Sequence, residues 1–160
     1  MRIAVWPVAA LAGTLAFNTW AGQSQDPWVG TWKLNPAESK YRPGPAPIST
    51  VTTIESWEGG LKYTVDVVTS DGESRHIEWH GKFDGKDNPV EGNPDVDTNV
   101  LKRINKHSYR VIAKKDGKIV SVTKNVISHD GQRRTATLTG MNAELTQGSG
   151  VNDIAVFDRQ

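Results

Sequence analysis

Residues 61–83 read LKYTVDVVTSDGESRHIEWHGKF, and this stretch decides the fold. Apolar residues recur at every second position in each half: Leu61, Tyr63, Val65 and Val67, then Ile77, Trp79 and Phe83. A period of two is the spacing of side chains that share one face of a β-strand. Asp71-Gly72, between the halves, tolerates the positive φ angles of a tight turn. The stretch therefore predicts a β-hairpin with one apolar face.

The same signals continue through the rest of the chain. Asp-Gly recurs at Asp84-Gly85, Asp116-Gly117 and Asp130-Gly131. From Gly22 onward, 14 Val, 8 Ile and 12 Thr outnumber 6 Ala, 5 Leu and one Met, which favours strands over helices. We expect nine strands, at Val29–Leu34, Thr50–Trp57, Leu61–Thr69, Glu73–Phe83, Thr98–Ile104, Ser108–Lys114, Lys118–Ser128, Arg133–Thr139 and Val151–Arg159.

Strands of this number joined by short turns form an antiparallel meander. An open meander leaves two unpaired edges, and closure removes both. The sequence thus predicts an all-β fold, an antiparallel up-and-down barrel of about eight to ten strands, in one domain over residues 22–160. A two-sheet sandwich is the alternative.

The first 21 residues have the pattern of an export signal. Arg2 gives a positive start, Ile3–Phe17 is a largely apolar run, and small residues allow cleavage after Ala21. The run is shorter than the roughly 20 residues that cross a bilayer, so no membrane span is expected. We therefore predict a signal peptide over 1–21 and a periplasmic or secreted protein.

Composition excludes several classes of function. The chain has no cysteine, which rules out a thiol enzyme and a disulfide-stabilised mini-protein. Its 19 basic and 18 acidic residues leave no basic surface for nucleic acid, so no nucleic-acid partner is expected. The basic pairs Lys114-Lys115 and Arg133-Arg134 are interpreted as solvated strand and turn positions.

Several segments together resemble a family. Gly30-Thr31-Trp32 is similar to the Gly-x-Trp motif on the first strand of lipocalins and other calycin barrels. Longer stretches resemble exported bacterial lipocalin-like proteins: GTWKLNPAESK (30–40), PGPAP (43–47), FDGKDNPVEGNPDVD (83–97), KRI (102–104) and VFDRQ (156–160). The resemblance covers nearly all of residues 26–160 and implies a β-barrel rather than a particular chemistry. It also implies that a late arginine, Arg159 or else Arg103, packs over Trp32 at the base.

The apolar faces of the hairpin predict a binding wall. A barrel of this size encloses side chains or one small ligand. We expect a small apolar or amphipathic ligand, without a cofactor, and Arg103 as the anchor for a ligand carboxylate. The expected wall residues are Tyr63, Val65, Ile77, Trp79 and Phe83. The alternative is that these side chains fill a solid core.

The run His76-Ile77-Glu78-Trp79-His80 allows other interpretations. His76, Glu78 and His80 share one strand face, which we interpret as the hydrated outer face, without a metal. Glu78 or His80 with Arg103 could instead serve a cofactor-independent isomerase, cyclase or lyase on the same barrel. An envelope structural or interaction module is a third possibility. Asp84–Asp97 is expected to be an acidic loop whose spacing does not match a calcium loop.

Overall fold

The computed structural model describes residues 26–140 and 152–160. In these two segments the chain forms ten β-strands. They are β1 (Gly30–Leu34), β2 (Ser49–Trp57), β3 (Gly60–Val68), β4 (Ser74–Lys82), β5 (Asp87–Glu91), β6 (Thr98–Asn105), β7 (Ser108–Lys115), β8 (Lys118–Ile127), β9 (Arg133–Gly140) and β10 (Asn152–Arg159). Each strand pairs antiparallel with its neighbours in the sequence.

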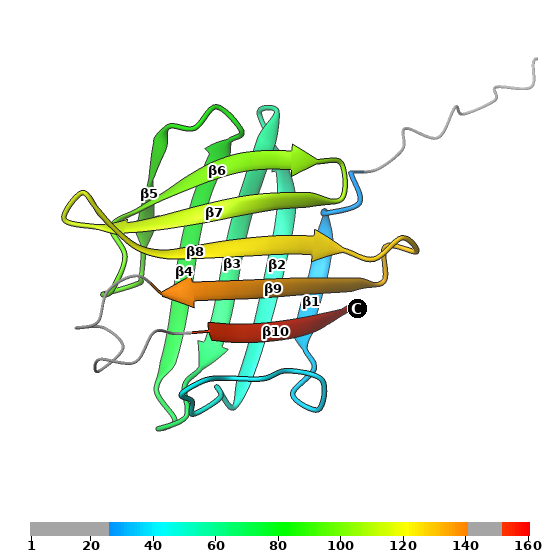
Figure 1. Cartoon of the computed structure of the whole chain (residues 1–160), viewed down its shortest axis with the longest axis vertical. Coiled ribbons are helices and arrows are strands. Elements are labelled where there is room, and N and C mark those ends of the chain that lie inside the picture. Colours follow the sequence, from blue (N-terminus) through cyan, green and yellow to red (C-terminus); the bar gives the residue numbers. More distant parts are fainter. Residues whose placement is uncertain (1–25, 141–151) are drawn as a thin grey trace, which may run out of the picture.

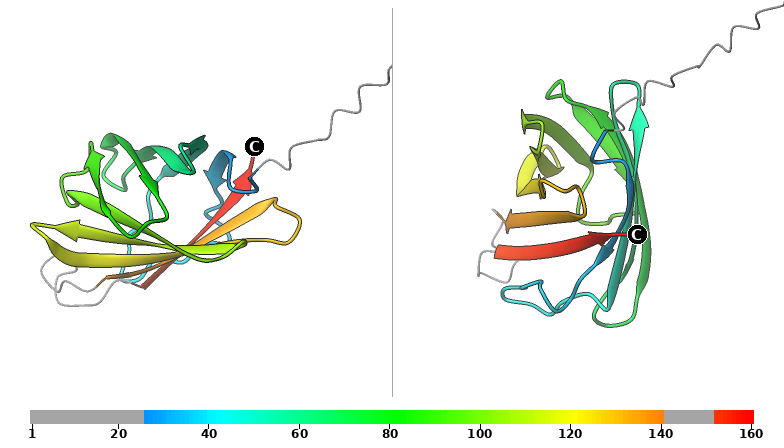
Figure 2. Two further views of the ribbon diagram at one scale, coloured as in Figure 1. Left: turned by 90° about the horizontal axis from the view of Figure 1, so that it is seen from above. Right: turned by 90° about the vertical axis from the view of Figure 1, so that its right-hand side faces the viewer.

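The first strand closes the sheet into a barrel. β1 pairs with β2 on one side and with β10 on the other, so neither edge of the meander stays open. The register places Trp32 opposite Thr52 and opposite Arg159. Strands β6–β10 cross in front of β1–β4 in Figure 1. Figure 2 shows the same two groups of strands as the two facing walls of a flattened barrel.

The predicted up-and-down barrel is confirmed, with two local corrections. Each described end of the nine expected strands differs from the structure by no more than one residue. The first correction is β5, which lies inside the segment expected to be an acidic loop. The sequence did not predict this strand, because Asp87, Asn88 and Pro89 are of residue types typical of turns. The second is Phe83, which follows the last residue of β4 and belongs to a turn.

One end of the barrel is filled by large side chains. The largest fully buried residues are Trp28, Trp32, Ile54, Leu61, Leu101 and Tyr109, and we call these six the basal core. Gly30, where β1 begins, lies opposite Ile54, and Leu61 and Tyr109 are near the starts of their strands. The basal core closes the end of the barrel at which β1 begins.

Some expectations concern residues that the structure does not describe. The signal peptide predicted over 1–21 and Val151, the first residue of the last expected strand, lie outside the described residues. The domain expected over 22–160 is described from residue 26 onward, apart from 141–151. In the two described segments, no helix has the length and apolar character needed to cross a membrane.

Candidate functional site

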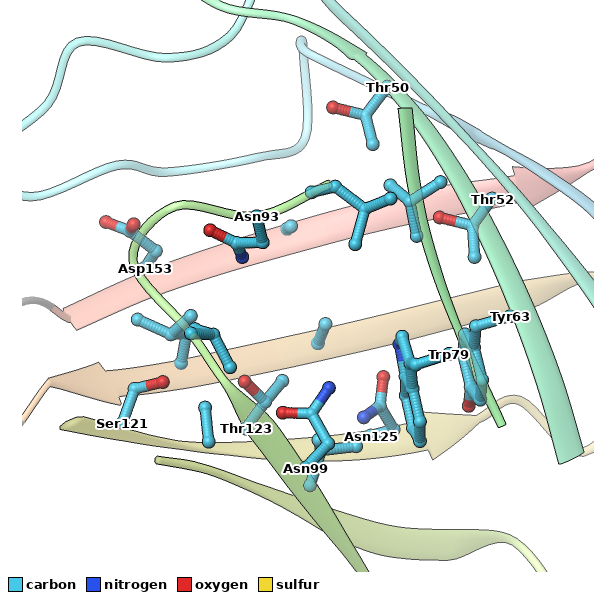
Figure 3. Close-up of a pocket in the computed structure, with 18 of the residues that line it drawn as sticks. Thr50, Thr52, Tyr63, Trp79, Asn93, Asn99, Ser121, Thr123, Asn125 and Asp153 are labelled. Atoms are coloured by element: carbon cyan, nitrogen blue, oxygen red, sulfur yellow. The ribbon is translucent and has the colours of Figure 1, made fainter. Parts of the chain in front are cut away.

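A cavity of about 330 Å³ lies inside the barrel beyond the basal core. Each wall contributes side chains that alternate inward along their strands. The apolar lining is Val65, Ile77, Trp79, Val90, Val96, Val111, Ala113, Ala136, Leu138, Ala155 and Phe157. The polar lining is Tyr41, Thr50, Thr52, Tyr63, Asn93, Asn99, Ser121, Thr123, Asn125, Arg134 and Asp153. Figure 3 shows many of these side chains converging from facing strands on one space.

Aromatic side chains separate the cavity from the basal core. The rings of Tyr63 and Trp79 stack in parallel, with centroids 4.3 Å apart and an angle of 5° between the planes. The Tyr63 hydroxyl contacts the hydroxyl of Tyr109, which packs edge-on against Trp28 and Phe83. Such edge-to-face contacts stabilise aromatic clusters beyond the area they bury. The stacked rings of Tyr63 and Trp79 therefore form a rigid aromatic floor beside the open space of the cavity (Figure 3).

Arg134 is the unusual residue of the wall. It is 5% exposed, although it carries a guanidinium group that is almost never buried without a partner. Its guanidinium lies 4.0 Å from the ring centroid of Phe157, and one terminal nitrogen donates a hydrogen bond of 3.0 Å to Asn125 Oδ1. Within residues 26–140 and 152–160, its Nε has no hydrogen-bond acceptor and no carboxylate forms an ion pair with it.

Burial changes the acid–base behaviour of this end of the cavity. Desolvation lowers the pKa of Arg134 to about 10, and the neighbouring Tyr109 acts in the opposite direction. Arg134 therefore stays a cation at neutral pH. Desolvation also raises the pKa of the Tyr109 phenol above its usual value, so Tyr109 stays neutral. The deep end of the cavity thus carries a positive charge in an apolar surrounding.

Further polar groups are buried along the wall. Thr52, Asn99 and Asn125 are each almost inaccessible to solvent, and Asn99 Oδ1 has no hydrogen-bond donor among the described residues. The amides of Asn99 and Asn125 lie beside Trp79 and face the cavity in Figure 3. Buried polar groups that lack protein partners usually meet water or a ligand. The inner wall therefore offers hydrogen-bonding groups to a bound molecule that has polar atoms.

The opposite end of the cavity has a different polar pair. Asp153 accepts a hydrogen bond of 2.8 Å from the backbone N–H of Arg42, and partial burial raises the pKa of its carboxyl. Burial, and then the charge of Asp153, raise the pKa of Tyr41 to about 12. Tyr41 follows β1 and Asp153 is the second residue of β10, and an antiparallel bridge between Lys40 and Ile154 holds these two segments side by side.

The structure brings together four of the six predicted binding residues. Tyr63, Val65, Ile77 and Trp79 line the cavity. The remaining two lie elsewhere: Phe83 and Arg103 do not line it, since Phe83 packs in the turn after β4 and the exposed Arg103 stacks on its ring at 3.7 Å.

The residues of the enzyme alternative lie on the outer surface. His76 Nδ1 is 2.6 Å from Asp66 Oδ1, and its Nε2 is 3.3 Å from Glu78 Oε1. These carboxylates raise the pKa of the exposed His76. His80 is exposed and packs on Trp57. Glu78, His80 and Arg103 therefore do not converge inside the barrel, and within the described segments no group of three such side chains is placed to hold a metal ion.

The three residues expected at the base of the barrel, Gly30, Trp32 and Arg159, lie together in the structure. Arg159 lies 4.3 Å from the ring centroid of Trp32, and it donates hydrogen bonds to the backbone carbonyls of Gly131, Val29 and Pro27. A Cβ atom at Gly30, whose φ is 145°, would come within 2.5 Å of the guanidinium of Arg159. Glycine at position 30 thus leaves the room that the stack of Arg159 on Trp32 needs. This arginine is the first of the two that the resemblance suggested.

Sequence reasoning missed Arg134, and it was wrong to treat the Arg133-Arg134 pair as solvated. Only Arg133 points outward, where it pairs with Glu38 and Asp158. A signal was available in the sequence. Arg134, Ala136 and Leu138 alternate along β9 with more polar neighbours, so period two places Arg134 on the apolar face.

Comparisons with known proteins add no family assignment. A scan of the chain against protein-family models finds no matching model, and a search of the curated proteins finds no match. The function proposed below therefore rests on the fold and on the chemistry of the cavity.

Proposed function

We propose that this protein is an exported, lipocalin-like barrel that binds one small apolar or amphipathic molecule inside its cavity. The observation that carries the proposal is a space of about 330 Å³ with apolar walls and a few buried polar groups. Ligand pockets generally occupy about 300–1,000 Å³ and combine apolar walls with a few polar groups that orient the ligand. This cavity is at the lower end of that range, which favours a small ligand.

The physical driving force for such binding is the removal of apolar surface from water. Each Å² of apolar ligand surface that becomes buried contributes roughly 25 cal/mol. The aromatic floor adds a preformed flat face, because Tyr63 and Trp79 already stack on each other and lose little freedom when a ligand arrives. The basal core closes one end, so we infer that the ligand enters from the opposite end.

A neutral apolar fluorophore tests the proposal directly. N-phenyl-1-naphthylamine should bind the wild-type protein saturably, with one molecule per chain, and should quench tryptophan emission because Trp79 lines the cavity. Trp79→Ala should weaken this binding. Trp57→Ala is the matched control, since Trp57 packs on His80 outside the cavity. Absence of saturable binding, or equal affinity for wild type and Trp79→Ala, would contradict the proposal.

The proposed export has its own test. Expressed with its natural N-terminus in a Gram-negative host, the protein should reach the periplasm and begin near Gly22. Native mass spectrometry of that periplasmic material should show a retained small molecule. Full-length protein that begins at Met1 in the cytosol would contradict the export proposal, without affecting the proposal of ligand binding.

A further inference from the structure

We propose that the ligand is a small apolar carboxylic acid that enters with its carboxylate first and binds Arg134 at the deep end of the cavity. The inference rests on the proposed function and adds the chemical class and the orientation of the ligand. Its starting point is a guanidinium that lines the cavity, is almost completely buried and has one hydrogen-bond partner, Asn125, among the residues that the structure describes.

The surroundings of Arg134 that the structure describes compensate its charge only in part. A buried cation costs several kcal/mol of solvation unless an anion or several acceptors replace the lost water. Phe157 offers only its ring face, and Asn125 offers one oxygen. Arginine presents five N–H donors in a planar fork, which matches the two oxygens of a carboxylate. A monoanionic head group therefore supplies what the described surroundings lack.

The outward-facing neighbour of Arg134 shows that this arrangement is particular to the cavity. Arg133 precedes it on β9 and forms ion pairs with Glu38 and Asp158 on the outer surface. The same strand thus carries one exposed arginine with carboxylate partners and one buried arginine without a carboxylate partner in the described part of the chain. Arg134 is not needed to link β9 to its neighbours, because the ladder hydrogen bonds of the sheet do so.

The direction of the ligand follows from the order of residues along three adjacent strands. From the base outward, β8 presents Asn125, Thr123 and Ser121; β9 presents Arg134, Ala136 and Leu138; β10 presents Phe157, Ala155 and Asp153. The cation is at the inner end of this series, and the carboxylate of Asp153 is at the outer end. An acid that entered tail first would place its charge near Asp153 and leave Arg134 unpaired. Entry with the carboxylate first pairs the charges and lays the apolar body along Ala136, Leu138 and Ala155.

The size and single charge of the site favour a medium-chain monocarboxylate. A cavity of about 330 Å³ is small for a membrane lipid. A phosphate monoester is the other common source of an anionic head, but it carries nearly two charges at neutral pH. Arg134 neutralises only one of them. The deep end therefore fits a carboxylate better than a phosphate.

Competition against bound N-phenyl-1-naphthylamine provides the test, with decanoate, 1-decanol and decyl phosphate as competitors at pH 7. Wild type should bind decanoate at least about tenfold more tightly than decanol, because a carboxylate accepts two parallel hydrogen bonds from the guanidinium and neutralises its charge, whereas the neutral hydroxyl accepts one. Decyl phosphate should bind more weakly than decanoate. In Arg134→Met the preference for decanoate over decanol should disappear, whereas Arg133→Met, the matched control, should keep it.

The outcomes separate the inference from the function on which it rests. If the fluorophore and decanol bind but decanoate has no advantage, or if Arg134→Met keeps that advantage, the carboxylate inference is overturned and the cavity function stands. If decyl phosphate binds more tightly than decanoate, the head group is a phosphate and the inference is wrong. If neither the fluorophore nor decanol binds, the proposed function itself fails. Should Arg134→Met not fold, the wild-type comparison decides, and a preference below about threefold overturns the inference.

Discussion

Two arginines stack on aromatic rings in neighbouring parts of the barrel, but they differ in burial and in their hydrogen-bond partners. At the base, Arg159 lies 4.3 Å from the ring centroid of Trp32; in the cavity, Arg134 lies 4.0 Å from that of Phe157. Arg159 is partly exposed and donates to three backbone carbonyls. Arg134 is 5% exposed and, among the described residues, donates to one side-chain oxygen.

The difference distinguishes a structural cation from one that is available to a ligand. The hydrogen bonds of Arg159 join the end of the chain to the segment before β1 and to the turn before β9, so its charge is used within the fold. The charge of Arg134 is desolvated and only partly compensated. Four substitutions test this comparison.

Trp32→Ala should have the largest effect. Trp32 is completely buried in the basal core and also donates a hydrogen bond of 3.0 Å from its Nε1 to the carbonyl of Trp28. Loss of a buried tryptophan costs about 3–5 kcal/mol of unfolding free energy, which approaches the whole stability of a small domain. Urea denaturation should show this loss, and Trp79→Ala, beside the cavity, should lose less. Equal losses would mean that the cavity is packed like the base.

Arg159→Met should lower the unfolding free energy by about 2–3 kcal/mol. It removes the stack on Trp32 and the hydrogen bonds that hold the base together. Affinity for a cavity ligand should change little in the protein that remains folded. Arg103→Met is the control, because Arg103 also stacks on an aromatic ring, Phe83, but is exposed and should cost below about 1 kcal/mol. A strong loss of ligand affinity in Arg159→Met would contradict the separation of the two regions.

Tyr109→Phe should reduce the loss of stability at alkaline pH. Burial raises the pKa of Tyr109 above the value of 10.0 for a free phenol, so the unfolded chain releases this proton first. The contribution of Tyr109 is therefore complete below pH 10 and declines by up to about 1.4 kcal/mol per pH unit above it. Arg134, whose pKa is lowered to about 10, contributes with the opposite sign in the same range.

Comparison of the two proteins isolates the phenol. Urea denaturation between pH 9 and 11 should give a steeper decline for wild type than for Tyr109→Phe. Identical slopes would mean that Tyr109 is accessible to solvent, and the closed base would then be the wrong description.

Arg134→Met should change the unfolding free energy least, by no more than about 1 kcal/mol in either direction. The desolvation cost of the cation and its stack on Phe157 oppose each other, and a methionine of similar length fills the space without a charge. Urea denaturation of the ligand-free protein measures this, with Arg133→Met as the control. A loss above about 3 kcal/mol would make Arg134 a structural residue like Arg159 and would break the comparison.

Much of the fold could be predicted from the sequence, because strand periodicity and turn dipeptides are local signals. Residues 61–83 contain both, and their hairpin pairs in the predicted way, with Tyr63 opposite Trp79. The alternation also separated Trp79, which lines the cavity, from His76 and His80 on the outer surface. The sequence did not predict β5, because its short run of turn-forming residues becomes a strand only through its pairing with β4 and β6.

The binding site could be predicted only in part, because periodicity determines the face of a residue and not its depth along the barrel. Arg103 pairs in register with Tyr109 of the basal core, so it lies at the level of the base, whereas Asn99 on the same face of β6 lies at the level of the cavity. Depth depends on the stagger of all ten strands and on the closure of β1 onto β10. The sequence by itself determined the strands, the turns and the apolar faces, which depend on neighbours within a few residues. The tertiary structure decided that Arg134 of β9, rather than Arg103 of β6, meets Asn125 and Phe157 in the cavity, because the level of each side chain depends on the register of all the strands in the closed barrel.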